Sequence, residues 1–470
     1  MQPEEFRRHG HALVDWMADY LTGVADLPIT PAVAPGQIRR AIPSSPPTSG
    51  ESFDDLFRDF RDLIVPGMTH WNHPGWFAYF PCNNSPPSIL AEMLTSAIGA
   101  QCMSWATSPA ATELEQVVMD WLRQIIGLPP EFVGVIQDTA STATLVALLS
   151  ARERVTGGAA GAEGLAGAPP LAVYASAEAH SSVDKAVKLA GYGLARLRRI
   201  DTDRSFALRP ELLERALAQD TDDGIRPACV IASVGTTSSS AIDPVPAIGE
   251  VCRRHGVWLH VDAAYAGPAA IVPELRWILD GVAHADSVVL NPHKWLLTNF
   301  DCTAYYVRDP AALLGAFQAS PEYLRTAYDP EVVNFRDWGI QLGRRFRALK
   351  LWFVLRSYGV EGLQAMIRRH VALARELEGW IRQQPDFEVM APVPLGLVCF
   401  RYRPPGLSEA EVDELNRRLL GRVNATRRVF LTHTRLGGRY AIRLVVGQRG
   451  TERRHVEEAW GLLREAAEQL

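Results

Sequence analysis

Lys294 is the side chain whose sequence surroundings best suit a chemical task. The apolar run at residues 287–290 predicts a buried strand, which Pro292 ends because proline has no N–H to donate to a sheet. Lys294 follows, and Trp295 and Leu296 come directly after it. Burial lowers the pKa of a lysine and makes its amine nucleophilic, and such an amine most often forms a Schiff base with pyridoxal phosphate. Taken alone, the motif fits a lysine that reaches to water equally well.

Asp262 supplies the second group that a pyridoxal cofactor needs. It ends another predicted buried strand, at residues 257–261, and it lies 32 positions before Lys294. One helix-length segment, residues 273–283, separates the two strands, so they can be neighbours. A carboxylate that pairs with the ring nitrogen keeps the ring protonated and able to accept electrons. Capping of a turn is the less favoured interpretation of Asp262, because a buried carboxylate without a partner is costly.

A predicted strand at residues 132–137 runs through a short polar turn into a predicted helix at residues 142–154. The free amides at the start of such a helix bind phosphate, and hydroxyl groups add donors. An ordinary helix cap explains the same turn more simply when it is considered alone. The candidate phosphate-binding residues in this turn are Thr139, Ala140 and Ser141.

Two further polar residues follow predicted strands. His180 comes after a strand at residues 171–174, and Thr237 comes after one at residues 229–234. The alternation of strands and helices over residues 130–307 predicts a mostly parallel sheet covered by helices. Functional residues in such sheets gather at the carboxyl ends of the strands, so the shared position of all these candidates is a stronger signal than any single motif.

Composition narrows the classes of protein. The 470 residues, 47% of them hydrophobic, can form two or three domains, and the net charge of −5 gives no argument for nucleic acid or an anionic membrane. The sequence starts without the apolar segment of a signal peptide, and no stretch reaches transmembrane length. Its six cysteines show no C-x-x-C spacing, so no metal site is predicted, and isolated cysteines fit a reducing cytoplasm.

The regions outside the central sheet are predicted from periodicity and turn residues. An amphipathic helix at residues 6–22 precedes a proline-rich irregular tract at residues 28–50. Residues 70–81 are dense in aromatic residues and can form either core or the wall of an aromatic pocket. The other expected elements are a helix at residues 52–65 capped by Ser52, a helix at 108–126 and a mobile surface loop at 156–170.

The C-terminal third begins with a long polar segment at residues 315–337, which is typical of a lid. A helix is expected at residues 341–358, with Gly359 as its stop. From residue 362 the pattern predicts a smaller α/β domain. Its expected elements are a helix to residue 384, a strand at 396–402, a helix at 408–425, a strand at 440–446 and a last helix at 451–469.

These motifs together resemble the group II pyridoxal-phosphate-dependent decarboxylases, of the aromatic-L-amino-acid decarboxylase family. The resemblance extends from about residue 5 to about residue 460. The matching segments are residues 70–81, 104–109, 134–151, 180–182, 235–237, 258–267, 291–301 and 342–352.

The resemblance implies an α/β fold of the fold-type I, aspartate aminotransferase-like kind. Residues 1–85 would form a helical N-terminal segment that packs on a partner subunit. Residues 86–360 would form a large domain that binds pyridoxal 5'-phosphate on a mostly parallel seven-stranded sheet, and residues 361–470 a small C-terminal α/β domain. The enzyme would be a cytoplasmic homodimer with its active sites at the interface.

The resemblance also assigns roles to residues. Lys294 would bind the cofactor covalently, Asp262 would pair with the pyridine nitrogen and His180 would stack on the ring. Tyr323, on a mobile loop that Arg336 adjoins, would return a proton to the substrate carbon after carbon dioxide leaves. The implied cofactor-binding set is Thr139, Ala140, Ser141, His180, Thr237, Asp262, Ala264, Asn291, His293 and Lys294.

The implied substrate is an aromatic L-amino acid, with tryptophan, tyrosine, phenylalanine and dopa left unresolved. Gly343 matches the small residue linked to indole- or catechol-sized substrates, whereas Cys82 replaces a threonine that contacts catechols in animal members. Met103 replaces an aromatic residue, and Asp138-Thr139 stands where many members have Gly-Ser. The implied substrate pocket comprises Trp71, Tyr79, Phe80, Pro81, Cys82, Met103 and Gly343.

Three alternatives stay open at this point. Relatives that form aldehydes with oxygen tend to replace the loop tyrosine by phenylalanine or the stacking histidine by asparagine, and this chain retains both Tyr323 and His180. An aminotransferase is possible on the same scaffold. A non-catalytic binding protein of this fold would not need Lys294, Asp262, His180 and Tyr323 together.

Overall fold

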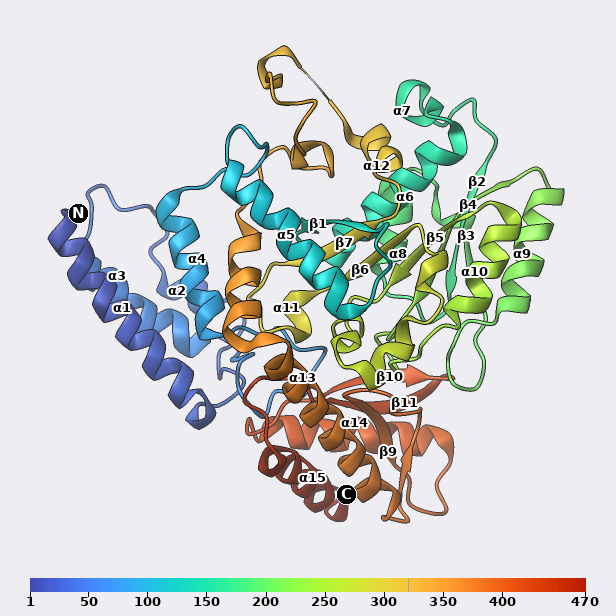
Figure 1. Ribbon diagram of the computed structural model, residues 1–470. Coiled ribbons are helices and arrows are strands. Elements are labelled where there is room, and N and C mark those ends of the chain that lie inside the picture. The colour runs from blue at the N-terminus through green and yellow to red at the C-terminus, as the bar shows by residue number, and fades with distance from the viewer. Residues whose placement is uncertain (320) are drawn as a thin grey trace.

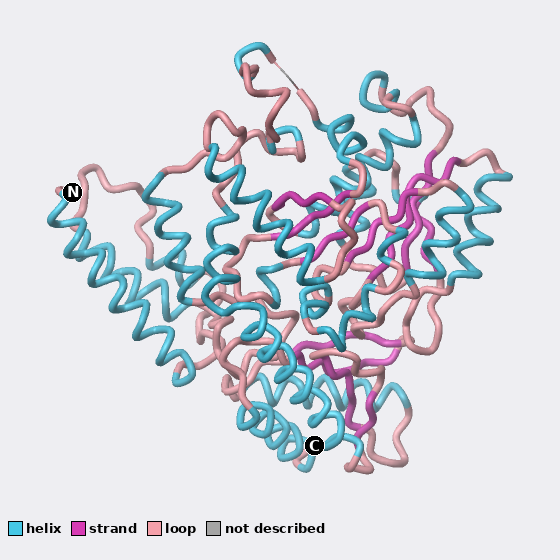
Figure 2. Tube along the Cα trace, viewed as in Figure 1, coloured by secondary structure: helices cyan, strands magenta, loops and turns pink. Residues whose placement is uncertain are grey.

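The computed structural model describes residues 1–319 and 321–470. Figure 1 shows a large sheet flanked by helices, a smaller sheet beside the C-terminus, and N-terminal helices along one side. The strands fall into these two groups in Figure 2 as well. Both features agree with the expected α/β class, in which a large sheet domain adjoins a smaller one.

The N-terminal region is helical, as expected. Its helices are α1 (Pro3–Gly23), α2 (Gln37–Ala41), α3 (Phe53–Asp59) and α4 (Pro86–Ile98). Helix α1 starts earlier than predicted because Gln2 and Glu5 form a capping box ahead of Pro3. The predicted cap of α3 is confirmed, since the Ser52 hydroxyl accepts a hydrogen bond from the amide of Asp55 at 3.1 Å. Neither α2, within the proline-rich tract, nor α4 was predicted.

The large sheet has seven strands in the order β1-β7-β6-β5-β4-β2-β3, which confirms the expected number. Strand β7 alone runs antiparallel to its neighbours, so the sheet is mostly parallel. The strands are β1 (Val133–Gln137), β2 (Leu171–Ser176), β3 (Leu197–Ile200), β4 (Arg226–Ser233), β5 (Trp258–Asp262), β6 (Ser287–Leu290) and β7 (Thr303–Val307).

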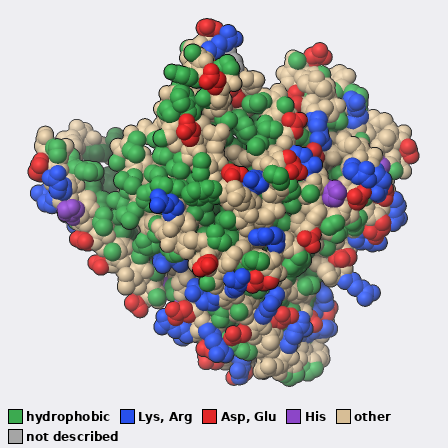
Figure 3. Space-filling view, viewed as in Figure 1, with side chains coloured by type: hydrophobic (Ala, Val, Ile, Leu, Met, Phe, Trp, Pro, Cys, Tyr) green, Lys and Arg blue, Asp and Glu red, His purple; other side chains and the backbone are tan. Residues whose placement is uncertain are grey.

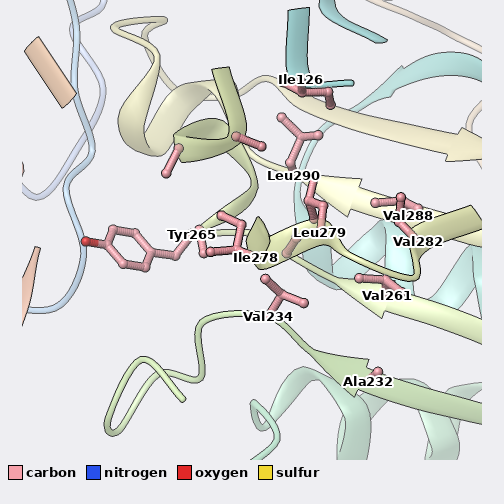
Figure 4. Packing of buried hydrophobic residues seen from close by; sticks show 14 of the residues in the cluster. Ile126, Ala232, Val234, Val261, Tyr265, Ile278, Leu279, Val282, Val288 and Leu290 are labelled. Carbon is pink, nitrogen blue, oxygen red and sulfur yellow. The ribbon is translucent and has the colours of Figure 1, made fainter. Parts of the chain in front are cut away.

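Two hydrophobic cores hold helices against the two faces of this sheet. Trp258 and Leu259 of β5 belong to different cores because successive side chains of a strand point to opposite faces. One face carries α6 (Ala140–Thr156), α8 (Ser182–Leu189) and α12 (Pro310–Phe317). The other face carries α5 (Pro109–Ile126), α9 (Pro210–Asp222) and α10 (Val245–His255). Figure 4 shows part of this second core, from which Tyr265 reaches outward.

Two connecting segments differ from the expectation. The helix-length segment between β5 and β6 consists of short 3-10 helices, and the predicted loop at residues 156–170 contains the short helix α7 (Ala159–Glu163). The short helical turns of the described chain are Val24–Asp26, Phe60–Ile64, Val65–Gly67, Leu194–Arg196, Gly267–Ile271, Pro273–Leu279, Val282–His284, Glu322–Leu324 and Phe335–Asp337.

The helix predicted at residues 341–358 is wrong in its start. Helix α13 (Arg347–Arg382) starts later than predicted, and it consists of two helical segments that meet at a kink at Gly359. Gly359 has φ 63° and ψ 172°, so it ends the first segment at the predicted position, and a second segment follows the kink. The predicted domain boundary after residue 360 falls beside this kink, and the division into domains stays a prediction.

The C-terminal region forms an antiparallel four-stranded sheet of order β10-β11-β9-β8 with helices packed on it. The predicted strands and helices here are confirmed within a few residues, whereas β8 and β10 were missed. The elements are β8 (Phe387–Val389), β9 (Leu397–Tyr402), α14 (Glu409–Ala425), β10 (Thr432–Leu436), β11 (Arg439–Val445) and α15 (Arg453–Glu468).

Candidate active site

The carboxyl ends of β1, β2, β4, β5 and β6 meet at one edge of the large sheet, beside a cavity of about 250 Å³. All ten residues of the predicted cofactor-binding set line this cavity. The strand-end argument had brought five of them together, namely Thr139, His180, Thr237, Asp262 and Lys294. The residues that also line it are Phe80, Ser182, Ser233, Gly235, Thr236, Tyr265 and Phe300. Apart from Phe80, they were not predicted, because serine, threonine and glycine after a strand are too common to signal a site, and single aromatic residues such as Tyr265 and Phe300 usually belong to the core.

Lys294 lies on the short helix α11 (Pro292–Trp295) directly after β6. Its ammonium nitrogen is 5.4 Å from the centre of the Phe80 ring, and its remaining exposure faces the cavity. Burial lowers the pKa of Lys294, although the nearby Asp262 opposes part of that effect. The backbone here is held by Asn83, whose amide nitrogen donates to the carbonyl oxygens of Lys294 and Gly447, both at 2.8 Å. No pattern in the sequence points to Asn83.

Asp262 is the last residue of β5, and β5 pairs with β6. The prediction that Asp262 and Lys294 follow neighbouring strands is therefore confirmed. One oxygen of Asp262 accepts a hydrogen bond from the amide of Ala264 at 3.1 Å. Over residues 1–319 and 321–470, no cationic side chain lies within salt-bridge distance of this carboxylate. A protonated pyridine nitrogen would supply the missing partner.

Two histidines of the site are held neutral and in fixed orientation. The amide of Ser182 donates to Nδ1 of His180 at 3.1 Å, and the amide of Cys302 donates to Nδ1 of His293 at 3.0 Å. In each neutral ring the proton therefore lies on Nε2. Burial lowers the pKa of His180, and burial together with Lys294 lowers the pKa of His293 to about 3.

The start of α6 provides the expected anion site. Thr139 caps this 17-residue helix, so the amides of Ala140 and Ser141 in its first turn have no carbonyl partner within the helix. The hydroxyl of Thr303 lies 2.8 Å from Oδ1 of Asn291, which leaves the amide nitrogen of Asn291 as a donor. These donors suit a phosphate, and the lysine and the lone carboxylate suit the aldehyde and the ring nitrogen. The residues present therefore fit pyridoxal 5'-phosphate.

A second and larger cavity, of about 600 Å³, adjoins the first and shares Phe80, His180 and Lys294 with it. Its walls are mostly aromatic and apolar, and the rings of Trp71 and Tyr79 stack there with centres 5.6 Å apart. The expectation of an aromatic-lined pocket from residues 70–81 agrees with this geometry. The predicted substrate residues that line it are Trp71, Tyr79, Phe80, Pro81 and Cys82.

Three predicted residues are not brought to these cavities within one chain. Tyr323 lies on a 3-10 turn (Glu322–Leu324) with 78% of its surface exposed. Met103 accepts a hydrogen bond from the amide of Arg336, and a side chain at Gly343 would contact Gln101. The roles of Tyr323, Met103 and Gly343 stay predictions.

The sequence comparison shows the class of protein. The profile described as "Pyridoxal-dependent decarboxylase conserved domain" matches residues 35–403, and the chain belongs to this family of pyridoxal-phosphate-dependent decarboxylases. Family membership agrees with the paired Lys294 and Asp262, with the anion site and with the fold.

Individual relatives cover the full length of the chain. It is 46% identical to the aromatic-L-amino-acid decarboxylase of Sus scrofa, over 100% of this chain and 98% of the relative. It is 44% identical to the phenylacetaldehyde synthase of Arabidopsis thaliana, over 100% and 97%. The crystal structure of Oryza sativa TDC with PLP and tryptamine superposes with a TM-score of 0.96 at 42% identity, and the match covers 100% of this chain and 99% of that one.

The described residues contain no helix that is both long and apolar enough to cross a membrane. They also contain no group of three or more histidine, cysteine or acidic side chains that could hold a metal ion.

Proposed function

We propose that this chain decarboxylates aromatic L-amino acids to the corresponding arylalkylamines and carbon dioxide. The observation that carries the proposal is the placement of Lys294 and Asp262 on adjacent strand ends, at a cavity that opens into an aromatic-walled one. When bound, pyridoxal 5'-phosphate supplies an electron-accepting ring that makes loss of carbon dioxide possible.

Each residue at the first cavity has a distinct task in this proposal. Lys294 would hold the cofactor covalently, because burial lowers the pKa of its amine and the amine lines the cavity. Asp262 holds a proton on the ring nitrogen, and His180 supports the ring face. The amides of Ala140 and Ser141 hold the phosphate, because they lack partners in their own helix.

The aromatic cavity receives the substrate side chain. Trp71 and Tyr79 form part of its wall, and Phe80 lines it beside Lys294. Cys82 also lines this cavity, and burial raises the pKa of its thiol, so it forms a neutral and weakly polar part of the wall. These surfaces suit a ring of indole, phenol or phenyl size better than a charged side chain.

The working enzyme is a homodimer in this proposal. Tyr323 is needed near Lys294 to return a proton to the substrate, yet in its own chain it is exposed and outside both cavities. A second copy can supply Tyr323, Met103 and Gly343. Figure 3 shows hydrophobic side chains gathered over α4 and the start of α5. The exposed apolar residues of α4 are Leu90, Met93, Leu94 and Ile98.

The cytoplasm is the proposed location. All six cysteines are unpaired, which suits a reducing compartment. The six are Cys82, Cys102, Cys229, Cys252, Cys302 and Cys399.

An aldehyde-forming reaction is the second candidate, since the similarity to the phenylacetaldehyde synthase of Arabidopsis thaliana is strong. Retention of Tyr323 and His180 favours the decarboxylase, because a proton donor at the substrate carbon directs the reaction to the amine. An aminotransferase would instead keep the carboxylate and release a 2-oxo acid.

Product analysis tests the proposal directly. Holoenzyme is incubated separately with L-tryptophan, L-tyrosine, L-phenylalanine and L-dopa, and carbon dioxide, amine, ammonia, hydrogen peroxide and 2-oxo acid are measured. The proposal predicts amine and carbon dioxide in equal amounts from at least one substrate. It fails if no substrate releases carbon dioxide, and peroxide with ammonia in place of amine would identify an aldehyde synthase.

A further inference from the structure

Tyr79 has a backbone conformation that needs support. Its φ is +53°, in the left-handed region, which is unfavourable for a residue other than glycine. The ring of Tyr79 stacks on Trp71 at an interplanar angle of 14°, and both rings line the aromatic cavity. The strained backbone therefore sets where one wall of the proposed substrate pocket stands.

Both polar groups of the Tyr79 backbone are bound from the small C-terminal sheet. The amide of Tyr79 donates to the hydroxyl oxygen of Thr432 at 3.3 Å, and Nη2 of Arg443 donates to the carbonyl oxygen of Tyr79 at 3.3 Å. Nη1 of the same guanidinium donates to Thr432 Oγ1 at 2.8 Å. Thr432 and Arg443 are direct cross-strand partners on β10 and β11, so the three residues form a closed arrangement across two distant parts of the chain.

Arg443 is an unusual residue to find in this place. Only 3% of its surface is exposed, and across the described residues no carboxylate lies within 4.0 Å of it. Its Cζ lies 5.4 Å from the centre of the Phe80 ring, which offsets part of the cost of burial. A buried cation without a counter-ion is unfavourable for stability, so a contribution to stability does not explain why Arg443 is present. The planar fork binds two acceptors at fixed spacing, which a lysine cannot do.

We propose that Thr432 and Arg443 are positioning residues that hold Tyr79 in its left-handed conformation and thereby set the size of substrate ring that the enzyme accepts. Neither residue is among those that line the two cavities, so both act through Tyr79. The proposal rests on the proposed function, because it takes the aromatic cavity as the site of the substrate side chain.

Thr432→Val tests this directly, because valine has the shape of threonine without the acceptor oxygen. We expect the KM ratio of L-tryptophan to L-phenylalanine to change about tenfold, because small differences in fit within an apolar pocket change substrate discrimination by about that factor. The value of kcat stays within about twofold, because the reacting groups near Lys294 are untouched. The absorbance of the bound cofactor stays the same.

A readout that needs no catalysis accompanies the kinetics. Hydrogen–deuterium exchange of holoenzyme is followed in the peptide that contains residues 77–82. Thr432→Val is expected to speed exchange there at least fivefold, because the amide of Tyr79 loses its acceptor. Thr432→Ser keeps the hydroxyl and is expected to behave as the parent protein in both assays.

Thr434→Val is the matched control. Thr434 lies two residues along β10, and its hydroxyl is 3.0 Å from that of Ser238, whereas the described hydrogen bonds of the Tyr79 backbone go to Thr432 and Arg443. If Thr432→Val and Thr434→Val changed exchange and the KM ratio equally, the proposal would be overturned. Arg443→Lys is a second probe, and it should change the KM ratio in the same direction as Thr432→Val.

Activity of the parent protein and the response to Thr432→Val distinguish failure of the proposed function from failure of the proposed role of Thr432 and Arg443. If the parent protein decarboxylated no aromatic amino acid, the proposed function would fail, and the role in substrate choice would fail with it. If exchange at residues 77–82 were then faster in Thr432→Val but not in Thr434→Val, the claim that Thr432 holds the backbone of Tyr79 would still be supported. If the parent protein were active but neither readout responded to Thr432→Val, only the inference would fall.

Discussion

At the scale of single residues, the site combines a nucleophile, a carboxylate and an anion-binding turn, each from a different strand end. Lys294 and Asp262 could be predicted because few charged residues lie at or shortly after the end of a buried apolar strand. Contacts such as that of Asn83 with Lys294 could not, since they join segments more than 200 positions apart and follow no periodicity. The same holds for the contacts of Arg443 with Tyr79.

Tyr323→Phe tests the proposed proton donor. We expect amine formation to fall by at least about 100-fold, the usual contribution of a positioned acid, with peroxide and ammonia appearing in its place. Cofactor absorbance should be unchanged, because all ten residues of the proposed cofactor-binding set are retained. Tyr328→Phe, on the same loop and 4.9 Å from the Trp105 ring, serves as the control and should keep its activity. Full amine formation by Tyr323→Phe would remove this residue from the mechanism.

Buried neutral histidines predict the response of stability to acid. Burial lowers the pKa of His260 to about 4 and that of His370, which accepts a hydrogen bond from Trp295 at 3.0 Å, to about 3. Unfolded histidine titrates near 6.5, so between these values the unfolded chain binds more protons. Their stabilising effect is complete above about pH 6.5 and is lost as the pH falls toward the folded values, at about 1.4 kcal/mol per pH unit for each residue.

Denaturant unfolding at pH 7, 6 and 5 measures this effect. Below pH 6.5, His370→Asn should reduce the slope of the unfolding free energy against pH by the contribution of one proton, which is about 1.4 kcal/mol per pH unit. An unchanged slope would show that His370 is not held neutral in the folded protein.

At the scale of elements, the sheet was the most predictable part, because apolar runs and strand-end turns repeat through it. The small sheet was less predictable from the sequence. Residues 432–436 of β10 are mostly polar and partly exposed, so the strand exists because of its pairing with β11 and not because of its own pattern. The late start of α13 has a similar cause, since Arg344 bonds to Glu115 and to the carbonyl of Ile136 instead of entering the helix.

Two glycines of α13 test its kink. Gly359 has φ +63° and ψ 172°, which side chains other than that of glycine rarely adopt, so Gly359→Ala should destabilise the protein by about 1–3 kcal/mol. Gly379 lies in regular helix, where an added Cβ would have no atom within 4 Å, so Gly379→Ala should stabilise the protein by roughly 0.5–1 kcal/mol. Denaturant unfolding compares the two. Equal effects of the same sign would contradict the kink.

At the scale of the whole molecule, one chain brings all ten residues of the proposed cofactor-binding set to one cavity, whereas Tyr323, Met103 and Gly343 lie outside both cavities. The strand ends of the large sheet and the aromatic loop meet around Lys294, while Tyr323 stays outside both cavities. Asn83 links the backbone of Lys294 to that of Gly447, which follows β11. The sequence could imply this division only through family resemblance, because no local pattern says which side chains a second copy supplies.

Leu94→Glu tests the proposed dimer. Leu94 is 48% exposed on α4, and a charge there should weaken association at least tenfold, with loss of activity as the complex dissociates. Leu189→Glu is the control, since Leu189 is 73% exposed on α8, away from α4, and should leave assembly unchanged. Sedimentation velocity measures both variants. A monomeric and fully active parent protein would contradict the dimer.

The central claim is that Lys294 carries the cofactor, and the sequence makes it simple to check, because it contains only four lysines: Lys185, Lys188, Lys294 and Lys350. Holoenzyme is reduced with borohydride, digested, and its peptides are analysed by mass spectrometry. We expect a phosphopyridoxyl group on Lys294 alone, and none in Lys294→Ala treated in the same way. Label on another lysine, or no label in a protein that retains activity, would contradict it.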